Sequence, residues 1–594
     1  MVKIANLKIF LLFALLNRGY GHYKWQIISL SVLGIIGGLL EGIGINAIIP
    51  LFSFLTGSSS FGNDFISQFI KSGFDLVGIK FSLRYLLVLI FFLFLARAVV
   101  LLLNNYIKIK ITTNYSARLR KQLFTKMTNA DWGHLLKQKL GHLDTLLITN
   151  VRYSESLFQC LSQSVTVISG LTMYVLVALN ISVPITILTS VLGFFIFILF
   201  KPLLDRTRML SNKLENLNRE IAHFINEHVT GMKTVKATLS EEKVVKRGSD
   251  LFDAQKRYTI RALLYGILPD SLLQPIGLMY VLVIFAFAYK TPNFSLAALA
   301  AVVYLIEKMF IYIQQLQKLM QSINEYIPYL ESVIRYENEA VESREISEGV
   351  SQVSFKDSIE FKNVKFSYDG GKNIFNNLNL KIKQGEMVGI IGPSGVGKTT
   401  IVDLILRFFK PTSGTITIDG QNIADIKLKK WRTEIGYISQ DIFLLNDSIA
   451  NNIKFYNEEV SDQDIESAAK MANIFDFVNS TSNKFQTVIG ERGIMLSGGQ
   501  RQRIIIARVL AGHPRILILD EATSSLDNES EREIQNVIDN LKGTITVIII
   551  AHRLSTVKNV DKLVVLGDGE VQEEGSPEEL LSDGDSYFKK LYEI

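Results

Sequence analysis

The sequence predicts a helical membrane-spanning domain followed by an α/β domain, and three observations support that fold class. The chain has 594 residues, which is too long for a single hydrophobic core. Apolar residues make up 48% of the chain and charged residues only 20%, and the long apolar runs fall in its first half. Beyond residue 358, short β-rich runs alternate with helical ones, which indicates a largely parallel sheet.

Six stretches are long and apolar enough to cross a hydrocarbon core of ~30 Å, which takes about 20 helical residues. The third and fourth contain no charged residue and are separated only by a short turn. Buried helices of a large soluble domain are the alternative, and six such runs within 313 residues argue against it. We expect the spans at residues 26–55, 82–105, 157–180, 181–200, 262–289 and 295–313.

A shorter apolar run at residues 4–17 precedes the first span. A secretory signal peptide is one interpretation of such a run. No small-residue cleavage site follows, because the run ends in Leu15-Leu16-Asn17 and continues with Arg18. We therefore expect a short interfacial helix that leads into the first span.

Basic residues are concentrated on one side of the predicted spans. Residues 104–156 contain nine Lys and Arg and residues 201–261 contain thirteen, whereas residues 56–81 contain only Lys71 and Lys80. The positive-inside rule therefore places both termini and the α/β domain in the cytoplasm. Both basic stretches have helical periodicity, which predicts spans that continue far into the cytosol. Nucleic-acid binding explains them less well, because acidic residues are interspersed.

Residues 331–358 separate the two parts of the chain. They are polar and charged and contain no long apolar run, which is typical of a linker. We therefore expect a transmembrane domain at 1–330, a linker at 331–358 and an α/β domain at 359–594. The single cysteine, Cys160, excludes an intrachain disulfide and any cysteine-based zinc or iron–sulfur site.

A glycine-rich loop near the start of the α/β domain has the pattern of a phosphate-binding loop. It follows an apolar strand at 387–391 and precedes a helical run, which is the context that a P-loop requires. Backbone N–H groups and the helix N-terminus favour phosphate oxygens, Lys398 would contact the β- and γ-phosphates of ATP, and Thr399 would bind Mg²⁺. The residues expected at the nucleotide are Gly392, Pro393, Ser394, Gly395, Val396, Gly397, Lys398, Thr399 and Thr400.

Two adjacent carboxylates end another apolar strand, at 516–519. Asp520 is the residue that would hold Mg²⁺, and Glu521 is placed to polarise an attacking water as a general base. An acidic pair at a strand end is often only a helix cap. In a chain that also has a P-loop, the pair predicts a site of ATP hydrolysis.

The pentapeptide Leu496-Ser497-Gly498-Gly499-Gln500 resembles the signature of ATP-binding-cassette (ABC) proteins, and further motifs of that family occur in the family's order. Tyr368 stands where the family has an aromatic residue that stacks on adenine. Gln440 matches a catalytic glutamine that also binds Mg²⁺, and His552 matches a catalytic histidine at the γ-phosphate. Ser525-Leu526-Asp527 resembles the D-loop, although the family more often has Ala at the first position.

The resemblance implies a dimer with ATP and Mg²⁺ as its cofactors. In the family, ATP is held between two cassettes, so Ser497, Gly498, Gly499 and Gln500 would contact the ATP on the P-loop of the other chain. All motifs of this cassette are intact, so a homodimer is expected, and a heterodimer with a related half-transporter is the alternative.

Six spans ahead of one cassette resemble an exporter half-transporter of the lipid-flippase type, which would be an integral protein of the bacterial cytoplasmic membrane. Residues 443–453 and 490–493 are similar to exporter motifs, and 131–137 and 236–242 would be the coupling helices between spans and cassette. The implied function is ATP-driven export or flipping of an amphipathic lipid or a lipid-linked glycan. A multidrug or peptide exporter and an ATP-gated channel share this layout, whereas a soluble DNA-repair ATPase has no spans.

The substrate is indicated by few residues. Glu41, within Leu39-Leu40-Glu41-Gly42, resembles the first span of flippases for lipid-linked oligosaccharides. Charged residues inside spans are costly, so Glu41, Arg97, Asp270 and Glu307 should face protein or a wet cavity. Arg97 either pairs with a carboxylate or meets the phosphate of a substrate headgroup, and the sequence leaves both open.

Overall fold

The structure is a computed structural model, and it divides the chain into two compact units. One unit comprises Met1–Ala130 and His134–Arg344, and the other comprises Asp131–Gly133 and Glu345–Ile594. We call them the membrane unit and the ATPase unit. The residues described are 17–46, 72–76, 78, 82–138, 141–181, 183–288, 296–345, 349, 351, 355–368, 370–522, 527–551, 553–582 and 586–592.

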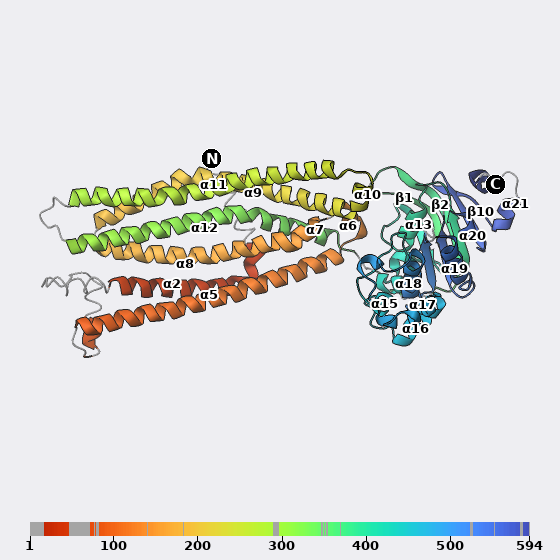
Figure 1. The fold of residues 1–594 in the computed structure, drawn as a ribbon, viewed down its shortest axis with the longest axis horizontal. Helices are drawn as coiled ribbons and strands as arrows, with labels where there is room; N and C mark the ends of the chain where they lie inside the picture. The colour runs from red at the N-terminus through yellow and green to blue at the C-terminus, as the bar shows by residue number, and fades with distance from the viewer. Residues whose placement is uncertain are drawn as a thin grey trace. The chain divides into compact units, whose positions relative to one another are not determined.

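Long helices form the membrane unit and run side by side in Figure 1, where α12 packs along α8 and α9. Four of them have 46 to 48 residues, so at 1.5 Å per residue each is about 70 Å long, more than twice the thickness of a hydrocarbon core. These helices therefore extend well beyond the membrane, as the sequence predicts. The long helices are α2 (Lys24–Asn46), α5 (Leu83–Thr128), α8 (Val151–Ile181), α9 (Val183–Thr230), α11 (Glu241–Ala288) and α12 (Leu296–Glu342).

Five segments of the described chain are helical, long and apolar enough to span a membrane: Asn17–Gly44, Leu83–Thr128, His142–Leu179, Val183–Thr230 and Glu241–Phe287. They coincide with the first five predicted spans, except that residues 47–55 lie outside the described residues. The sixth predicted span falls in α12, which begins at Leu296. Residues 4–16 of the expected interfacial helix also lie outside the described residues.

Helix α12 continues through residues that the sequence analysis assigns to a linker. It ends at Glu342, and the two units divide between Arg344 and Glu345. Val333, Tyr336 and Ala340 are buried at helical spacing, so one face of this polar-looking segment belongs to the core of the membrane unit. The glutamates that suggest a linker lie among these apolar residues. The linker is predicted from the polar composition of the segment, which does not reveal the helical spacing of its apolar residues.

A short 3₁₀ segment, η1 (Gly21–Tyr23), directly precedes α2. Other short segments lie between the long helices: α6 (Trp132–Lys137), α7 (His142–Asp144), the π-helix η2 (Thr145–Asn150) and α10 (Met232–Ala237). Helix α6 matches the first expected coupling helix, 131–137. The second was expected at 236–242, but α10 ends at Ala237 and α11 already begins at Glu241. The chain turns between them, where Leu239 has a φ of 51°. Residues 236–242 therefore comprise the end of α10, a turn at 238–240 and the start of α11.

Two sheets form the ATPase unit, which confirms the predicted α/β class. The six-stranded sheet has the order β10-β9-β3-β8-β7-β6 and is parallel except for β10, and the antiparallel four-stranded sheet has the order β2-β1-β4-β5. The strands are β1 (Ser358–Ser367), β2 (Asn373–Lys383), β3 (Met387–Ile391), β4 (Ser413–Ile418), β5 (Gln421–Asn422), β6 (Ile435–Ile438), β7 (Ile516–Asp520), β8 (Thr546–Ile550), β9 (Lys562–Gly567) and β10 (Glu570–Gly575).

Successive residues of the parallel strands are buried in two different cores. Val388 and Ile390 of β3 pack with the four-stranded sheet, whereas Met387 and Ile391 pack with helices on the opposite face. This double burial fixes the strand ends that carry the candidate site. The helices are α13 (Lys398–Ile405), α14 (Leu428–Thr433), α15 (Ile449–Lys454), α16 (Asp462–Met471), α17 (Phe475–Ser480), α18 (Gly498–Leu510), α19 (Asn528–Asp539), α20 (Leu554–Val557), α21 (Pro577–Ser582) and α22 (Tyr587–Tyr592), with 3₁₀ turns at Ile423–Asp425, Lys484–Gln486 and Glu491–Gly493.

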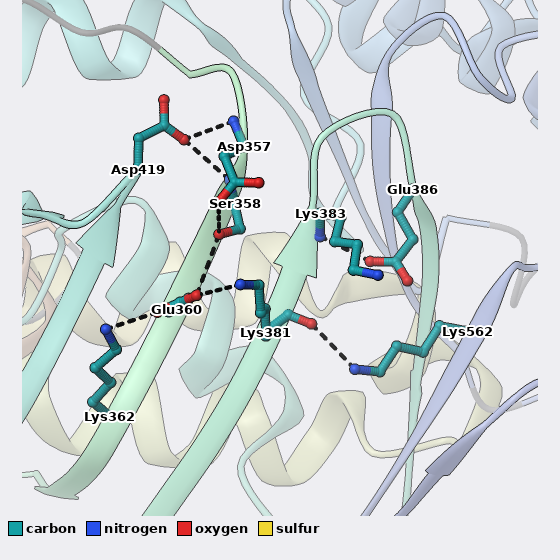
Figure 2. A network of polar contacts seen from close by, with 9 residues as sticks. All are labelled: Asp357, Ser358, Glu360, Lys362, Lys381, Lys383, Glu386, Asp419 and Lys562. Carbon is teal, nitrogen blue, oxygen red and sulfur yellow. Dashed lines mark hydrogen bonds and ion pairs between the residues drawn. The ribbon is translucent and has the colours of Figure 1, made fainter.

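The outer surface of the four-stranded sheet carries a polar network (Figure 2). Glu360 of β1 pairs with Lys362 at 2.8 Å and, across the strands, with Lys381 of β2 at 2.6 Å. Asp419 accepts hydrogen bonds from the backbone N–H groups of Lys356, Asp357 and Ser358. The network thus ties the start of β1 to the end of β4 and pins the register of β1 against β2.

Candidate functional site

The predicted P-loop lies between β3 and α13, so the strand–loop–helix context is confirmed. Gly397 has a φ of 108°, and a Cβ there would lie 2.6 Å from Ile374 Cγ2, so both backbone shape and space require glycine. Ser394, Gly395 and Val396 lie in the loop itself, and Thr400 lies in the first turn of α13. The backbone therefore has the form that closes around phosphate oxygens.

Lys398 is buried at the start of α13 and folds back over the loop. Its Nζ donates hydrogen bonds to the carbonyl oxygens of Gly392 at 2.8 Å and Pro393 at 3.1 Å. Burial lowers the pKa of Lys398, and the nearby carboxylates of Glu521 and Asp520 oppose that shift. These neutral carbonyls are weak partners for an ammonium group, so an anionic phosphate would bind it more strongly.

Asp520 is buried at the end of β7 and meets the first turn of α13. It is hydrogen-bonded to Thr399 and also to Tyr437, a residue of β6 that the sequence analysis does not single out. Burial, together with the neighbouring carboxylates Glu521 and Asp403, raises the pKa of Asp520 to about 6. A cation would relieve this repulsion, so the donor set of a carboxylate and a hydroxyl fits Mg²⁺.

The described residues contain no group of three or more His, Cys, Asp or Glu side chains arranged around a metal. A Mg²⁺ ion at a nucleotide does not need one, because phosphate oxygens and water complete its shell. The predicted ligands Asp520 and Thr399 are in contact. Gln440, the third predicted ligand, reaches the same strand end through Glu521.

Gln440 and Glu521 are brought together by strand order. Strands β6 and β7 are parallel neighbours, so the residues that follow them emerge at the same edge of the sheet. Gln440 Nε2 donates a hydrogen bond of 2.9 Å to Glu521 Oε2, and Glu521 has a φ of 51°. An uncommon backbone conformation at a carboxylate near the P-loop is typical of a functional residue. His552 lies outside the described residues, although β8 ends two residues before it and pairs with β7.

Tyr368 follows β1 and is held beside α13. Its hydroxyl is 3.1 Å from both Thr400 Oγ1 and Asp403 Oδ2, and its ring meets Phe366 and Phe409 edge-on at about 5 Å. The side chain remains 37% exposed, which leaves surface for a base to stack on. The sequence analysis missed Asp403. Its position on the same helical face as Thr400 was the available signal.

The signature residues lie at the N-terminus of α18. Ser497 caps the helix: its Oγ accepts from the N–H of Gln500 at 3.2 Å, and its own N–H donates to Gln500 Oε1 at 2.9 Å. A Cβ at Gly499 would collide with Ser530 Oγ of α19, whereas Gly498 is half-buried. The hydrogen bonds described for Ser497 and Gln500 stay within this turn. Ser525 and Leu526 lie outside the described residues, and Asp527 caps α19 through the N–H of Ser530.

A second polar cluster lies inside the membrane unit. Glu41 of α2 is buried and pairs with Arg97 of α5 at 2.7 Å. It also accepts hydrogen bonds from the hydroxyls of Tyr174 on α8, at 2.7 Å, and Tyr312 on α12, at 2.9 Å. Of the two partners that the sequence leaves open for Arg97, the structure therefore shows the carboxylate. The cluster joins four helices that lie far apart in the sequence.

Comparisons with known proteins match both units. Residues 46–291 match the ABC transporter transmembrane region and residues 375–524 match the ABC transporter family. An ATP-dependent lipid A-core flippase of Coxiella burnetii is 30% identical over 96% of this chain and 94% of its own length. A protein of the same description from Desulfotalea psychrophila is 38% identical over 63% of this chain and 66% of its own length. The solved structure of a bacterial Atm1-family ABC exporter with ATP bound has a TM-score of 0.79 and 23% identity and covers 98% of both chains, which shows the shared fold.

Proposed function

Because the chain belongs to the ABC transporters and has the layout of an exporter half-transporter, we propose that ATP hydrolysis in its ATPase unit moves an amphipathic lipid or a lipid-linked glycan across the membrane. The observation that carries this proposal is the combination of a complete P-loop and strand-end site with helices long enough to cross a bilayer and continue beyond it. The lipid class is supported by relatives described as lipid A-core flippases.

Each residue of the site has a part in this proposal. The P-loop backbone and Lys398 bind the phosphates, and the exposed ring of Tyr368 stacks on the base. Asp520, Thr399 and Gln440 hold Mg²⁺, which neutralises charge that develops on the phosphates. Glu521 accepts a proton from the attacking water while Gln440 fixes its carboxylate, and His552 contacts the γ-phosphate.

We further propose that two copies of the chain form one transporter in the bacterial cytoplasmic membrane. Ser497 is exposed, and its described hydrogen bonds leave the signature surface open to a second molecule. Ser497, Gly498, Gly499 and Gln500 would then contact the ATP bound by the partner. Isolated chains should hydrolyse ATP cooperatively if two identical copies suffice, whereas an obligate need for a second polypeptide would show a heterodimer.

Reconstitution into liposomes tests the transport proposal. We expect ATP and Mg²⁺ to change the leaflet distribution of a labelled lipid or lipid-linked oligosaccharide, and we expect no change when Glu521→Gln replaces the normal chain. Hydrophobic drugs and a short peptide form parallel arms of the same assay. Movement of drugs or peptides alone would favour the multidrug or peptide exporter, and the absence of ATP-driven movement of any substrate would contradict the proposal.

A further inference from the structure

Glu41 and Glu307 both lie in predicted spans, but only Glu41 is neutralised. Glu41 is surrounded by Arg97, Tyr174 and Tyr312. Glu307 of α12 is exposed, and among the described residues it has no ion pair or hydrogen bond. An uncompensated carboxylate is costly inside a membrane and therefore marks a place where something else binds.

Glu307 lines a cavity of about 710 Å³ between α11 and α12. The cavity has apolar walls, which include Ile306 and Phe310, and a few polar side chains, which are Ser271, Gln274, Gln314 and Glu307. This mixture of apolar surface and a small number of polar groups is typical of a ligand site. The volume is sufficient for a polar headgroup together with part of an acyl chain.

One carboxylate, Glu307, lines this cavity, together with three side chains that can accept hydrogen bonds, Ser271, Gln274 and Gln314. Pro275 on α11 has no N–H, so the carbonyl of Ser271, four residues earlier, loses its helical donor and adds an acceptor. Gln314, which lines the cavity, donates a hydrogen bond of 3.4 Å from its Nε2 to the carboxylate of Asp270. Among the described residues that line the cavity there is no Lys or Arg, and the adjacent Lys308 lies over the ring of Tyr304. The described lining therefore carries negative charge without a compensating cation.

We propose that this cavity binds the headgroup of the transported amphiphile and selects a positively charged amine, with Glu307 as the group that pairs with it. The proposal rests on the proposed function, because it names the substrate class of the same transporter. A protonated amine supplies both the positive charge and the N–H donors that the carboxylate of Glu307 lacks. A phosphate headgroup would meet the charge of Glu307 with no base to offset it.

Three amphiphiles with the same tail test this selection: dodecylamine, dodecyl phosphate and the neutral sugar dodecyl maltoside. Their binding to the full chain is measured without ATP, in nanodiscs of zwitterionic phosphatidylcholine, by displacement of radiolabelled dodecylamine. We expect dodecylamine to bind about tenfold or more tightly than dodecyl phosphate, and Glu307→Gln to lose that difference. Glu307→Asp keeps the charge and should retain the preference. Glu342→Gln, at the far end of the same helix, is the matched control and should bind like the normal chain.

Equal affinity of the normal chain and Glu307→Gln for dodecylamine would overturn the proposal, as would a preference for the phosphate or the sugar. Glu307→Asp separates the loss of charge from a folding defect, because it changes the side chain but keeps the negative charge. If Glu307→Asp binds dodecylamine as weakly as Glu307→Gln does, the amine proposal is also contradicted. Since binding is measured without ATP, the two proposals fail separately. Glu307-dependent amine binding without ATP-driven movement would reject the proposed function alone. ATP-driven lipid movement that is the same for the normal chain and for Glu307→Gln would reject only the amine site.

Discussion

The two units of the molecule hold their functional polar residues in different ways. In the ATPase unit, Gln440, Asp520 and Glu521 lie at the ends of the neighbouring strands β6 and β7, and a hydrogen bond joins Gln440 to Glu521. Lys398 begins the helix that follows β3 and donates hydrogen bonds to carbonyl groups of the P-loop. In the membrane unit, Glu41 and Arg97 lie within separate helices, α2 and α5, and meet only because those helices pack together. A sheet edge gathers residues by topology, whereas a helix bundle gathers them by packing.

This difference predicts different consequences of substitution. We propose that the residues at the sheet edge act on ATP, so their loss should affect turnover more than folding. The Glu41 cluster joins four helices, so its loss should affect stability more than ATP hydrolysis. The changes below test this contrast from the largest expected effect to the smallest.

Glu521→Gln should give the largest effect, a fall in ATP turnover of roughly 10²- to 10³-fold, because the amide cannot accept a proton from water. Lys398, Asp520 and Thr399 remain, so ATP binding should persist and the nucleotide-bound dimer should accumulate. Steady-state phosphate release measures turnover, and equilibrium binding of labelled ATP measures retention. Glu466→Gln makes the same chemical change in an exposed pair with Lys470 and should leave turnover unchanged. Near-normal hydrolysis by Glu521→Gln would remove Glu521 from the role of base.

Glu41→Gln should have the next largest effect, because it leaves Arg97 without its counter-charge inside the membrane unit. Loss of one partner of a buried ion pair costs about 3 kcal/mol, so the unfolding midpoint in nanodiscs should fall by several degrees while ATP binding persists. Tyr174→Phe removes one hydrogen bond to the same carboxylate and should cost about 1–2 kcal/mol. Glu307→Gln provides the contrast, because this glutamate has no described partner to lose. Equal unfolding midpoints for the Glu41 and Glu307 variants would contradict the distinction between a carboxylate that is held by an ion pair and hydrogen bonds and one that has no described partner.

The same contrast explains what the sequence predicts in the ATPase unit. The spacing of glycines around Lys398 and the carboxylates after an apolar strand indicate where the strands end, and parallel pairing then brings the ends together. This reasoning does not identify Tyr437 or Asp403. Tyr437 lies inside β6, where its hydrogen bond to Asp520 depends on side-chain orientation, and Asp403 meets Tyr368 only through the packing of β1 against α13.

In the membrane unit the sequence predicts the helices but not their contacts. The lengths of the apolar runs predict the spans well. The sequence does not indicate that Glu41 contacts Arg97, 56 positions later, together with tyrosines from two further helices. The helical extension of α12 beyond residue 330 is missed for a related reason. Val333, Tyr336 and Ala340 recur at helical spacing, but many charged residues lie between them. The overall composition of this stretch therefore suggests a linker even though its apolar residues have the spacing of a helix.

Two substitutions of Tyr368 distinguish the stacking of its ring from the contacts of its hydroxyl group, and the expected effects on ATP binding are smaller. Tyr368→Ala removes the ring and should weaken ATP binding about tenfold, since stacking of a base on an aromatic ring contributes about 1–3 kcal/mol. Tyr368→Phe keeps the ring but loses the contacts with Thr400 and Asp403, so we expect only about a two- to threefold loss. Titration with a fluorescent ATP analogue measures both. A Phe variant as weak as the Ala variant would show that the hydroxyl contacts, rather than stacking, dominate.

Glu360 should give the smallest effect, and the size of that effect depends on pH. Its ion pairs with Lys362 and Lys381 lower the pKa of Glu360 from 4.5 to about 2. A carboxyl group whose pKa is lowered by folding stabilises the folded state above the unfolded value of 4.5, and that contribution is lost as the pH falls toward 2. Glu360→Gln should therefore lower the unfolding midpoint slightly at pH 7, and the difference should shrink between pH 4.5 and pH 3. Because the side chains of Lys362 and Lys381 are about half exposed, 1 M salt should also reduce the difference, whereas the shift caused by Glu41→Gln should resist salt. Glu458→Gln, in an exposed turn of the same unit, is the control. A Glu360 shift that survives both acid and salt would mean that the surface network behaves like the buried cluster, and the contrast between the two units would not hold for stability.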